Sequence, residues 1–362
     1  MAERMNGLSI ELLSHPGETL QEVLESNNMT QKELAARIGV SPKHINQIVA
    51  GLTGISSEVA FKLEKVFNLS SRFWMNLQAK YDSEKMALLE VEQISDAEKA
   101  VFQNEIYKSL EKWGYLKREK TTEQKIIQMR DFLGVSSLLN INSTISANAL
   151  FRKSNKLATD NFALATWMKI CEIETNKIDL SAQLDTSLLE QKIPDIRKLM
   201  LQEDPNVMIE ELREIFAQCG IAFAVVRNVK HAPVQGFIRK INNKMRLCLT
   251  LRNKYTDIFW FTLFHEIGHI LDGKNDYFVD FVEKDSNSAE IHADKFATET
   301  LISKRDYTWF TRRGHFGKKE IVDFSKVIGV RPGIVVGRLQ HDKFIPQSFH
   351  NDLKDKYMWA NE

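Results

Sequence analysis

Two histidines and a glutamate in the segment His265–His269, H-E-I-G-H, have the types and spacing of a metallopeptidase site. Residues four apart on a helix are stacked neighbours, so His265 and His269 can present both imidazoles to one metal ion. Glu266 lies about 100° further round the helix and can reach a metal-bound water, taking its proton and later handing it to a leaving amine. The arrangement predicts a zinc peptidase, and the alternative is a set of hydrogen-bonded core residues.

The helix that carries this motif is expected to begin at Asp257 as N-cap and to end at Gly273. Its first half, Ile258–Phe264, is apolar on nearly every face. We therefore expect the helix to run through a core rather than across a surface.

A second helix near Ser288–Ala297 supplies candidates for the third metal ligand. Glu290 and Asp294 are four apart, so both can face the metal helix. Glu290 would bind the metal, and Asp294 would accept the free N–H of a ligand histidine and fix its tautomer. His292 is the rival ligand, on a different face of the helix. Alternatively, Glu290 only complements the helix dipole, which leaves Asp294 unexplained.

These motifs together resemble the ImmA/IrrE family of bacterial metallopeptidases. H-E-I-G-H is followed, 21 residues after His269, by E-x-x-A-D-x-F-A, and the similarity spans roughly residues 206 to 340, including Pro332–Leu339. The resemblance implies a zincin-like domain with Zn²⁺ held by His265, His269 and Glu290, and Glu266 as the catalytic acid and base.

The residues between 206 and the metal helix indicate a small sheet. A helix over Val207–Cys219 precedes a buried strand, Ile221–Val226. Gly236–Ile241 and Lys244–Leu251 form a hairpin about Asn242-Asn243, residue types that suit the positive φ of a two-residue turn. Alternation in the second hairpin strand predicts one core face and one exposed face. Because this strand precedes the metal helix, we expect it to be the edge at which an extended peptide substrate pairs.

Three further residues are candidates for stabilising a tetrahedral oxyanion: Tyr307, His315 and His341. The sequence does not choose among them.

A second motif lies near the N-terminus. Thr30–Glu33 is a capping box that starts one helix, Gly39–Ser41 makes a tight turn, and Ser41 caps another helix with Pro42 at its first position. This is the helix-turn-helix pattern, whose second helix would enter a major groove of DNA.

The outward face of this second helix supplies candidate DNA contacts, because Ile45 and Ile48 are expected to face inward. The predicted contacts are Lys43, His44, Asn46 and Gln47, with Gln31 placed for a phosphate. Residues 1–82 hold eight basic and nine acidic residues. This charge balance gives the segment no net attraction to DNA, which is unusual for a DNA-binding domain. A helical bundle that contacts proteins is therefore the alternative.

Three segments resemble the HigA-type antitoxin branch of the lambda-repressor-like fold: His15–Glu18, Gly51–Thr53 and Phe73–Gln78. The resemblance implies a double-stranded DNA operator and a toxin as partners. A two-fold homodimer is the default for this kind of reader.

The length of 362 residues predicts two or three domains. We expect a mainly α chain with a small α+β part: a five-helix helix-turn-helix domain over residues 1–82, a helical connector over 83–200 and a zincin-like metallopeptidase domain over 201–362. The connector contains no recognisable catalytic or binding motif. A sensor domain is the alternative role for this segment.

Composition is that of a soluble globular protein, with 43% hydrophobic and 27% charged residues. The longest apolar run is too short to span a bilayer, and the N-terminus has no signal-peptide pattern. The three cysteines lack C-x-x-C spacing, which suits a reducing cytosol. We therefore expect a cytoplasmic protein. With a net charge of +1, any nucleic-acid binding must come from local patches.

Together these features predict a regulator that joins operator binding to zinc-dependent cleavage of a protein. The resemblance implies that the substrates are transcriptional repressors or antitoxins, cut during stress, mobile-element or phage responses. Two alternatives remain open. The metal domain could be a non-catalytic partner-binding or sensing module, or the peptidase could cut this same chain between its domains.

Overall fold

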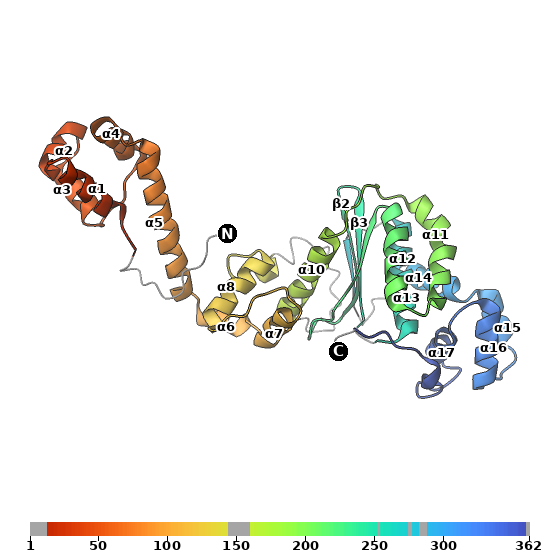
Figure 1. The fold of residues 1–362 in the computed structure, drawn as a ribbon. Helices are drawn as coiled ribbons and strands as arrows, with labels where there is room; N and C mark the ends of the chain where they lie inside the picture. Colours follow the sequence, from red (N-terminus) through yellow and green to blue (C-terminus); the bar gives the residue numbers. More distant parts are fainter. Residues whose placement is uncertain (1–12, 144–159, 252–253, 274–276, 282–287, 360–362) are drawn as a thin grey trace. The chain divides into compact units, whose positions relative to one another are not determined.

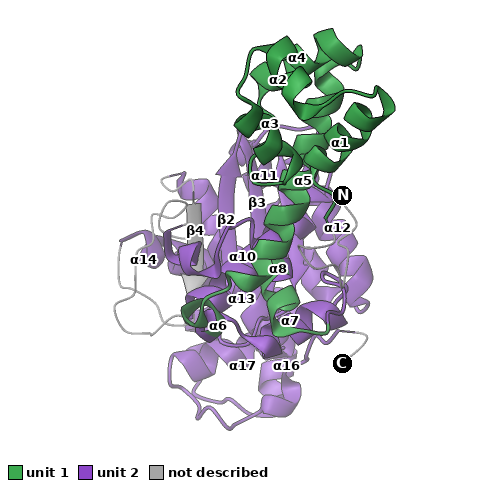
Figure 2. Ribbon diagram, turned by 90° about the vertical axis from the view of Figure 1, so that its left-hand side faces the viewer, with its two compact units in different colours: residues 1–99, 120–127 green, residues 100–119, 128–362 purple. Residues whose placement is uncertain are grey.

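The computed structural model describes residues 13–143, 160–251, 254–273, 277–281 and 288–359, which are mainly helical. The chain divides into two compact units, coloured separately in Figure 2. Unit 1 comprises residues 1–99 and 120–127, and unit 2 comprises residues 100–119 and 128–362. This division differs from the boundaries expected at residues 82 and 200.

Unit 1 opens with five helices: α1 (Pro16–Ser26), α2 (Gln31–Ile38), α3 (Pro42–Val49), α4 (Ser57–Phe67) and α5 (Ser71–Glu92). Each helix starts at a residue whose side chain accepts a hydrogen bond from a first-turn N–H: His15, Thr30, Ser41, Ser56 and Ser70. Their apolar faces enclose one core around the fully buried Leu34, Ile45 and Trp74. The fifth helix continues to Glu92, so it includes the residues that we expected to open the connector.

The described residues in the rest of the expected connector include these elements: α6 (Asp96–Val101), α7 (Asn104–Lys112), α8 (Thr122–Leu133), η2 (Leu138–Asn140), α10 (Asn161–Asn176), α11 (Thr186–Lys198) and η3 (Leu199–Leu201). Pro194 lies inside α11 without ending it, contrary to the interruption that a proline predicts. From α10 onward the connector belongs to unit 2.

Unit 2 is built on a four-stranded sheet made of β1 (Ile221–Val226), β2 (Val234–Ile241), β3 (Lys244–Thr250) and β4 (Tyr277–Phe281). The order is β1-β3-β2-β4, with β1 parallel to β3 and the other pairs antiparallel. The hairpin turn is confirmed, because Asn242 and Asn243 have φ of 48° and 57°. The edge prediction is wrong. β3 lies between β1 and β2, so both its sides are already hydrogen-bonded and no peptide can pair there.

Helices cover both faces of the sheet (Figure 1). α12 (Pro205–Gln218) and α13 (Thr256–Asp272) pack on one face, and α10 packs on the other. The expected exposed face of β3 is therefore covered, and Cys248 is fully buried. Trp167 of α10, also fully buried, meets Phe237 of β2 edge to face, with 6.1 Å between ring centroids.

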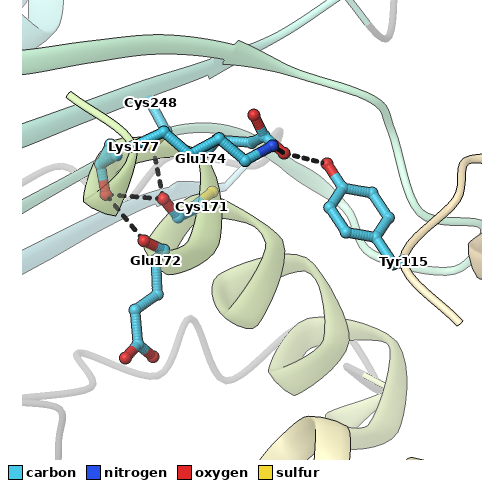
Figure 3. A network of polar contacts seen from close by, with 7 residues as sticks. Tyr115, Cys171, Glu172, Glu174, Lys177 and Cys248 are labelled. Carbon is cyan, nitrogen blue, oxygen red and sulfur yellow. Dashed lines mark hydrogen bonds and ion pairs between the residues drawn. The ribbon is translucent and has the colours of Figure 1, made fainter.

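Polar contacts hold the far end of α10 in place (Figure 3). The Tyr115 hydroxyl donates to Glu174 over 2.6 Å, and Lys177 reaches the same carboxylate oxygen at 2.8 Å. The Cys248 thiol lies 3.8 Å from the carbonyl oxygen of Cys171. α10 is thus an integral layer of unit 2 rather than a tether.

The remaining helices complete the layer around α13: α14 (Ser288–Leu301), α15 (Lys304–Thr311), α16 (Lys318–Ile328), α17 (Pro332–His341) and η4 (Asn351–Leu353). α13 is buried along most of its length and ends at Gly273 with φ of 64°, as expected. Its N-cap is Tyr255 rather than Asp257. Asp257 lies inside the first turn, where its carboxylate pairs with Lys354 at 2.7 Å. No described helix is both long and apolar enough to cross a membrane.

Candidate metal centre and nucleic-acid interface

The structure brings His265, His269 and Glu290 together between α13 and α14. Their candidate ligand atoms all lie within 4.8 Å of one another, and all three residues are buried. The two Nε2 atoms are 3.0 Å apart. The Glu290 oxygens lie 3.3 Å from Nε2 of His265 and 3.4 Å from Nε2 of His269. Two imidazole nitrogens and a carboxylate oxygen around one point are a donor set that fits zinc.

Asp294 lies one helical turn beyond Glu290 and contacts His265 from its other side. The Asp294 Oδ1 atom is 2.9 Å from Nδ1 of His265. A carboxylate this close favours the tautomer that carries its proton on Nδ1, which leaves the Nε2 lone pair on the side of Glu290 and His269. His292, the rival ligand, is exposed and lies outside this cluster.

A close approach of the two helices makes the cluster possible. Gly268 faces α14, and a Cβ at this position would lie 3.0 Å from the Cα of Ala293. Any larger residue at either position would push the helices apart and move Glu290 away from the histidines. The small residues Ala289 and Ala293 predict such packing, but the contribution of Gly268 was not singled out from the sequence.

Glu266 is fully buried and lies against β2. A Cβ at Gly236 would meet its Oε1 at 2.0 Å, so only glycine at that position leaves room for the carboxylate. The β2–β4 pairing is irregular between Val234 and Gly236. Gln235 also faces α13, and its Oε1 accepts a hydrogen bond from Thr262 at 3.3 Å. An irregularity that places consecutive residues toward one helix is typical of a bulge beside an active site.

Gly236 could have been found from the sequence. A glycine inside a predicted strand often marks a close approach of another group, and Gly236 stands at the start of the expected strand Gly236–Ile241. Which group approaches depends on how the strand packs against the metal helix. That packing has no local signature.

A pocket of about 410 Å³ lies directly beside the cluster. Phe261, Thr262 and Asp294 line it, so it begins within one helical turn of His265. The remaining lining residues come from β2, α13, α14, the turn after α14, and α17: Gln235, Asp257, Ile258, Thr298, Leu301, Ile302, Ile334, Gly337, Arg338 and His341. The wall is mostly apolar, with polar groups at its margin.

Of the three oxyanion candidates, His341 is the one that lines this pocket. Its Nδ1 lies 2.9 Å from Oδ1 of Asp342. Tyr307 is half-buried, and burial followed by the nearby Asp342 carboxylate raises the pKa of its hydroxyl well above the usual range. His315 is exposed. Tyr307 and His315 are absent from the residues that line the pocket.

In unit 1, α2 and α3 form the expected helix-turn-helix. Ile45 and Ile48 are fully buried, so α3 turns its opposite face outward. On that face Lys43 and Asn46 are exposed, and His44 and Gln47 are half-buried.

Gln31 links three helices at this surface. Its Nε2 donates to Gln21 of α1 at 3.2 Å, and its Oε1 accepts from Asn46 of α3 at 3.4 Å. Gln31 therefore fixes the first turn of α2 beside the outward face of α3. The structure thus places all five predicted nucleic-acid contacts on α2 and α3.

Comparisons with known proteins cover this N-terminal part. Residues 20–74 match the family model described as "Helix-turn-helix". The chain is 38% identical over 69 residues to virulence-associated protein I of Dichelobacter nodosus, covering 19% of this chain and 64% of that protein, slightly less than two thirds of its length. It is 32% identical over 63 residues to an uncharacterized HTH-type transcriptional regulator, YddM, of Escherichia coli (strain K12), covering 17% of this chain and 67% of that protein.

Among solved structures, antitoxin HigA of Pseudomonas aeruginosa, determined with the higBA promoter, is 36% identical. The alignment covers 23% of this chain and 91% of that chain, with a TM-score of 0.22. Through its N-terminal residues, this chain belongs to the helix-turn-helix family.

Proposed function

We propose that the protein is a DNA-binding regulator whose C-terminal unit is a zinc-dependent endopeptidase, as its resemblance to the ImmA/IrrE family implies. The observation that carries the peptidase proposal is the buried cluster of His265, His269 and Glu290, with their ligand atoms within 4.8 Å of one another. The burial of Glu266 against β2 and the contact of Asp294 with His265 support giving these residues the two further roles that such a site needs.

The residues around the cluster have distinct roles in this proposal. His265, His269 and Glu290 would hold Zn²⁺, which when bound acts as a Lewis acid on a carbonyl and lowers the pKa of water. Asp294 orients His265 through Nδ1. Glu266 takes a proton from the attacking water and delivers it to the leaving amine. Gly236 gives the Glu266 carboxylate the room to do so.

The N-terminal helices would bind a double-stranded DNA operator. α3 presents Lys43, His44, Asn46 and Gln47, and Gln31 lies within reach of a phosphate next to them. Membership of the helix-turn-helix family supports this role, as does the similarity to a protein described as an HTH-type transcriptional regulator.

The resemblance to ImmA/IrrE peptidases and to HigA-type antitoxins supports a repressor or an antitoxin as the peptidase substrate. A toxin is the corresponding binding partner, and a homodimer is the expected DNA-binding form. The chain itself is a second possible substrate, cut between its two units.

The test compares wild-type protein with Glu266→Gln in the native host. New protein N-termini that need wild-type Glu266 identify the substrate, and a fragment of the chain itself identifies self-cleavage. Purified Glu266→Gln should keep its zinc while cleavage falls by at least about 10²-fold. Glu299→Gln is the matched control, because Glu299 is exposed on α14 and outside the cluster.

If both proteins keep zinc but the new N-termini are identical in the two strains, the peptidase proposal is wrong. A regulatory phenotype that survives in Glu266→Gln but fails in His265→Ala would then identify the cluster as a metal-stabilised binding module.

A further inference from the structure

A pocket on the opposite face of the sheet from α13 is lined in part by charged side chains that have no role in the proposed function. Its volume is about 80 Å³, enough for several water molecules. It is formed by α8, the residues that follow it, α10 and strands β2 and β3. The lining residues are Leu133, Val135, Ile141, Ala165, Met168, Lys169, Glu172, Phe237, Arg239 and Arg246.

Two arginines stand directly opposite each other in this pocket. Arg239 of β2 and Arg246 of β3 are cross-strand partners in the antiparallel ladder, and both are half-buried. Like charges at directly opposed positions destabilise a sheet. Lys169 of α10 adds a third positive charge to the lining, and Glu172 is its one acidic member. Three of the four charged side chains in the lining are therefore cationic.

Two of these charged side chains have partners beside the pocket. Lys169 pairs with Glu172 at 3.2 Å, and Arg246 donates a hydrogen bond to the side-chain oxygen of Asn176. Burial lowers the pKa of the Arg246 guanidinium, the Glu172 carboxylate raises it, and the charge of Arg239 lowers it further. Two guanidinium groups at directly opposed positions can share one anion between them, each through charged hydrogen bonds.

The rest of the lining is apolar. Leu133, Val135, Ile141, Ala165 and Met168 form the wall beside the arginines, and the Phe237 ring lies on the sheet side. A paired cationic group next to an apolar wall is suited to a ligand with a charged head and a short hydrocarbon body. Guanidinium groups bind carboxylate and phosphate oxygens through two parallel hydrogen bonds.

We propose that this pocket binds a small organic anion. The carboxylate or phosphate head lies between Arg239 and Arg246, and a short apolar chain lies against Leu133, Val135 and Met168. The small volume restricts the ligand to a few carbon atoms beyond its head. This proposal is independent of the peptidase proposal, because the pocket lies under α10 and shares no lining residue with the pocket beside the metal cluster.

Four probes that differ in head and body test the proposal with the full-length chain. Propyl phosphate and butanoate carry both parts, propanol lacks the charge, and inorganic phosphate lacks the apolar body. Titration calorimetry is the measurement. We expect at least one of the two-part probes to bind at least about tenfold more tightly than propanol and inorganic phosphate. Comparing propyl phosphate with butanoate identifies the preferred head.

The variants Arg239→Gln and Arg246→Gln should each weaken that binding by about tenfold or more, since each removes a charged hydrogen-bond donor. Lys240→Gln is the matched control. It removes the same charge from the neighbouring, exposed position of β2, outside the pocket, and should leave binding unchanged. Circular dichroism of each variant establishes that the fold is retained.

Two results would overturn the proposal. One is equal binding, or none, of all four probes to wild-type protein. The other is a two-part probe that binds the Arg239→Gln and Arg246→Gln variants as tightly as it binds the Lys240→Gln variant. These measurements do not depend on zinc content or on cleavage. They therefore test the anion site even if the peptidase proposal is wrong.

Discussion

Gly236 on β2 and Glu266 on α13 are in such close contact that a methyl group on the glycine would overlap the glutamate carboxylate, 2.0 Å from Oε1. The carboxylate is the end of a flexible side chain, so Gly236→Ala should fold with Glu266 displaced. We expect zinc content to stay at the wild-type level while cleavage falls by at least about tenfold, because the proton acceptor has moved. Metal analysis and cleavage of the host substrate measure the two effects. Unchanged cleavage would show that the position of Glu266 is not critical.

Alanine substitutions of Glu290 and His292 are expected to have opposite effects on the zinc content of the protein. Glu290 is buried between His265 and His269, whereas His292 is exposed on the same helix. Glu290→Ala should lose most of its bound zinc, and His292→Ala should keep it. Elemental analysis of the purified variants decides between them, and the reverse pattern would end the assignment of Glu290 as third ligand.

Asp294→Asn tests how His265 is held. An amide has about the same size as the carboxylate but no negative charge to accept and stabilise the Nδ1–H. We expect zinc affinity to fall by about 10–100-fold, measured by competition with a chelator. Asp195→Asn, at an exposed site on α11, is the matched control and should bind zinc as wild type does.

DNA recognition is expected to depend on the outward face of α3. Losing Lys43 or Gln47 should cost about 1–3 kcal/mol at a cognate site and relax the preference for its sequence. Binding to a selected duplex and to single-base variants of it provides the measurement. Lys62→Ala on α4, outside the two helices α2 and α3 that hold the predicted contacts, is the control. If the wild-type chain binds no selected duplex at low salt, unit 1 has another role.

The stability of unit 1 should depend on pH through His15. Its Nδ1 accepts a hydrogen bond from the Gly17 N–H at 2.9 Å and caps α1. Burial lowers the pKa of His15 below the ordinary value of a histidine. The unfolded chain therefore binds a proton more readily, and this cap stabilises fully above about pH 6.5 but less as pH falls below that value. His15→Asn keeps a capping acceptor that does not titrate.

The melting temperature should accordingly fall more between pH 7.5 and pH 5.5 in wild-type protein than in His15→Asn. Scanning calorimetry of both full-length proteins measures the difference. Parallel pH profiles would mean that the protonation of His15 is not coupled to folding.

Local periodicity was sufficient to predict the arrangement of those site residues that lie on the same helix. Spacing by four placed His265 beside His269, and Glu290 on the same face as Asp294. The type of residue at Asn242 and Asn243 was enough to predict the turn of the hairpin. These features depend on neighbours within one or two turns of the chain, and there the sequence carries the whole signal.

What the sequence did not predict depends on contacts between distant segments. β4 pairs with β2 from beyond the metal helix, and β1 pairs with the far side of β3, so β3 became an interior strand. Asp257 has the local signature of an N-cap, yet its partner is Lys354, almost a hundred residues later. Cys248 alternates with core residues as an exposed position would, but α10 covers it.

Because α10 covers one face of the sheet, it limits where the chain can be cut without exposing the core of unit 2. A fragment starting at residue 201 would leave out Trp167 and lay bare the Phe237 side of the sheet, a loss comparable to removing a core tryptophan, about 3–5 kcal/mol. A fragment that is to keep the cluster of His265, His269 and Glu290 in a folded unit must therefore begin before α10, near the start of unit 2 at residue 100. In evolutionary terms, the smallest transferable unit that contains this cluster is longer than residues 201–362.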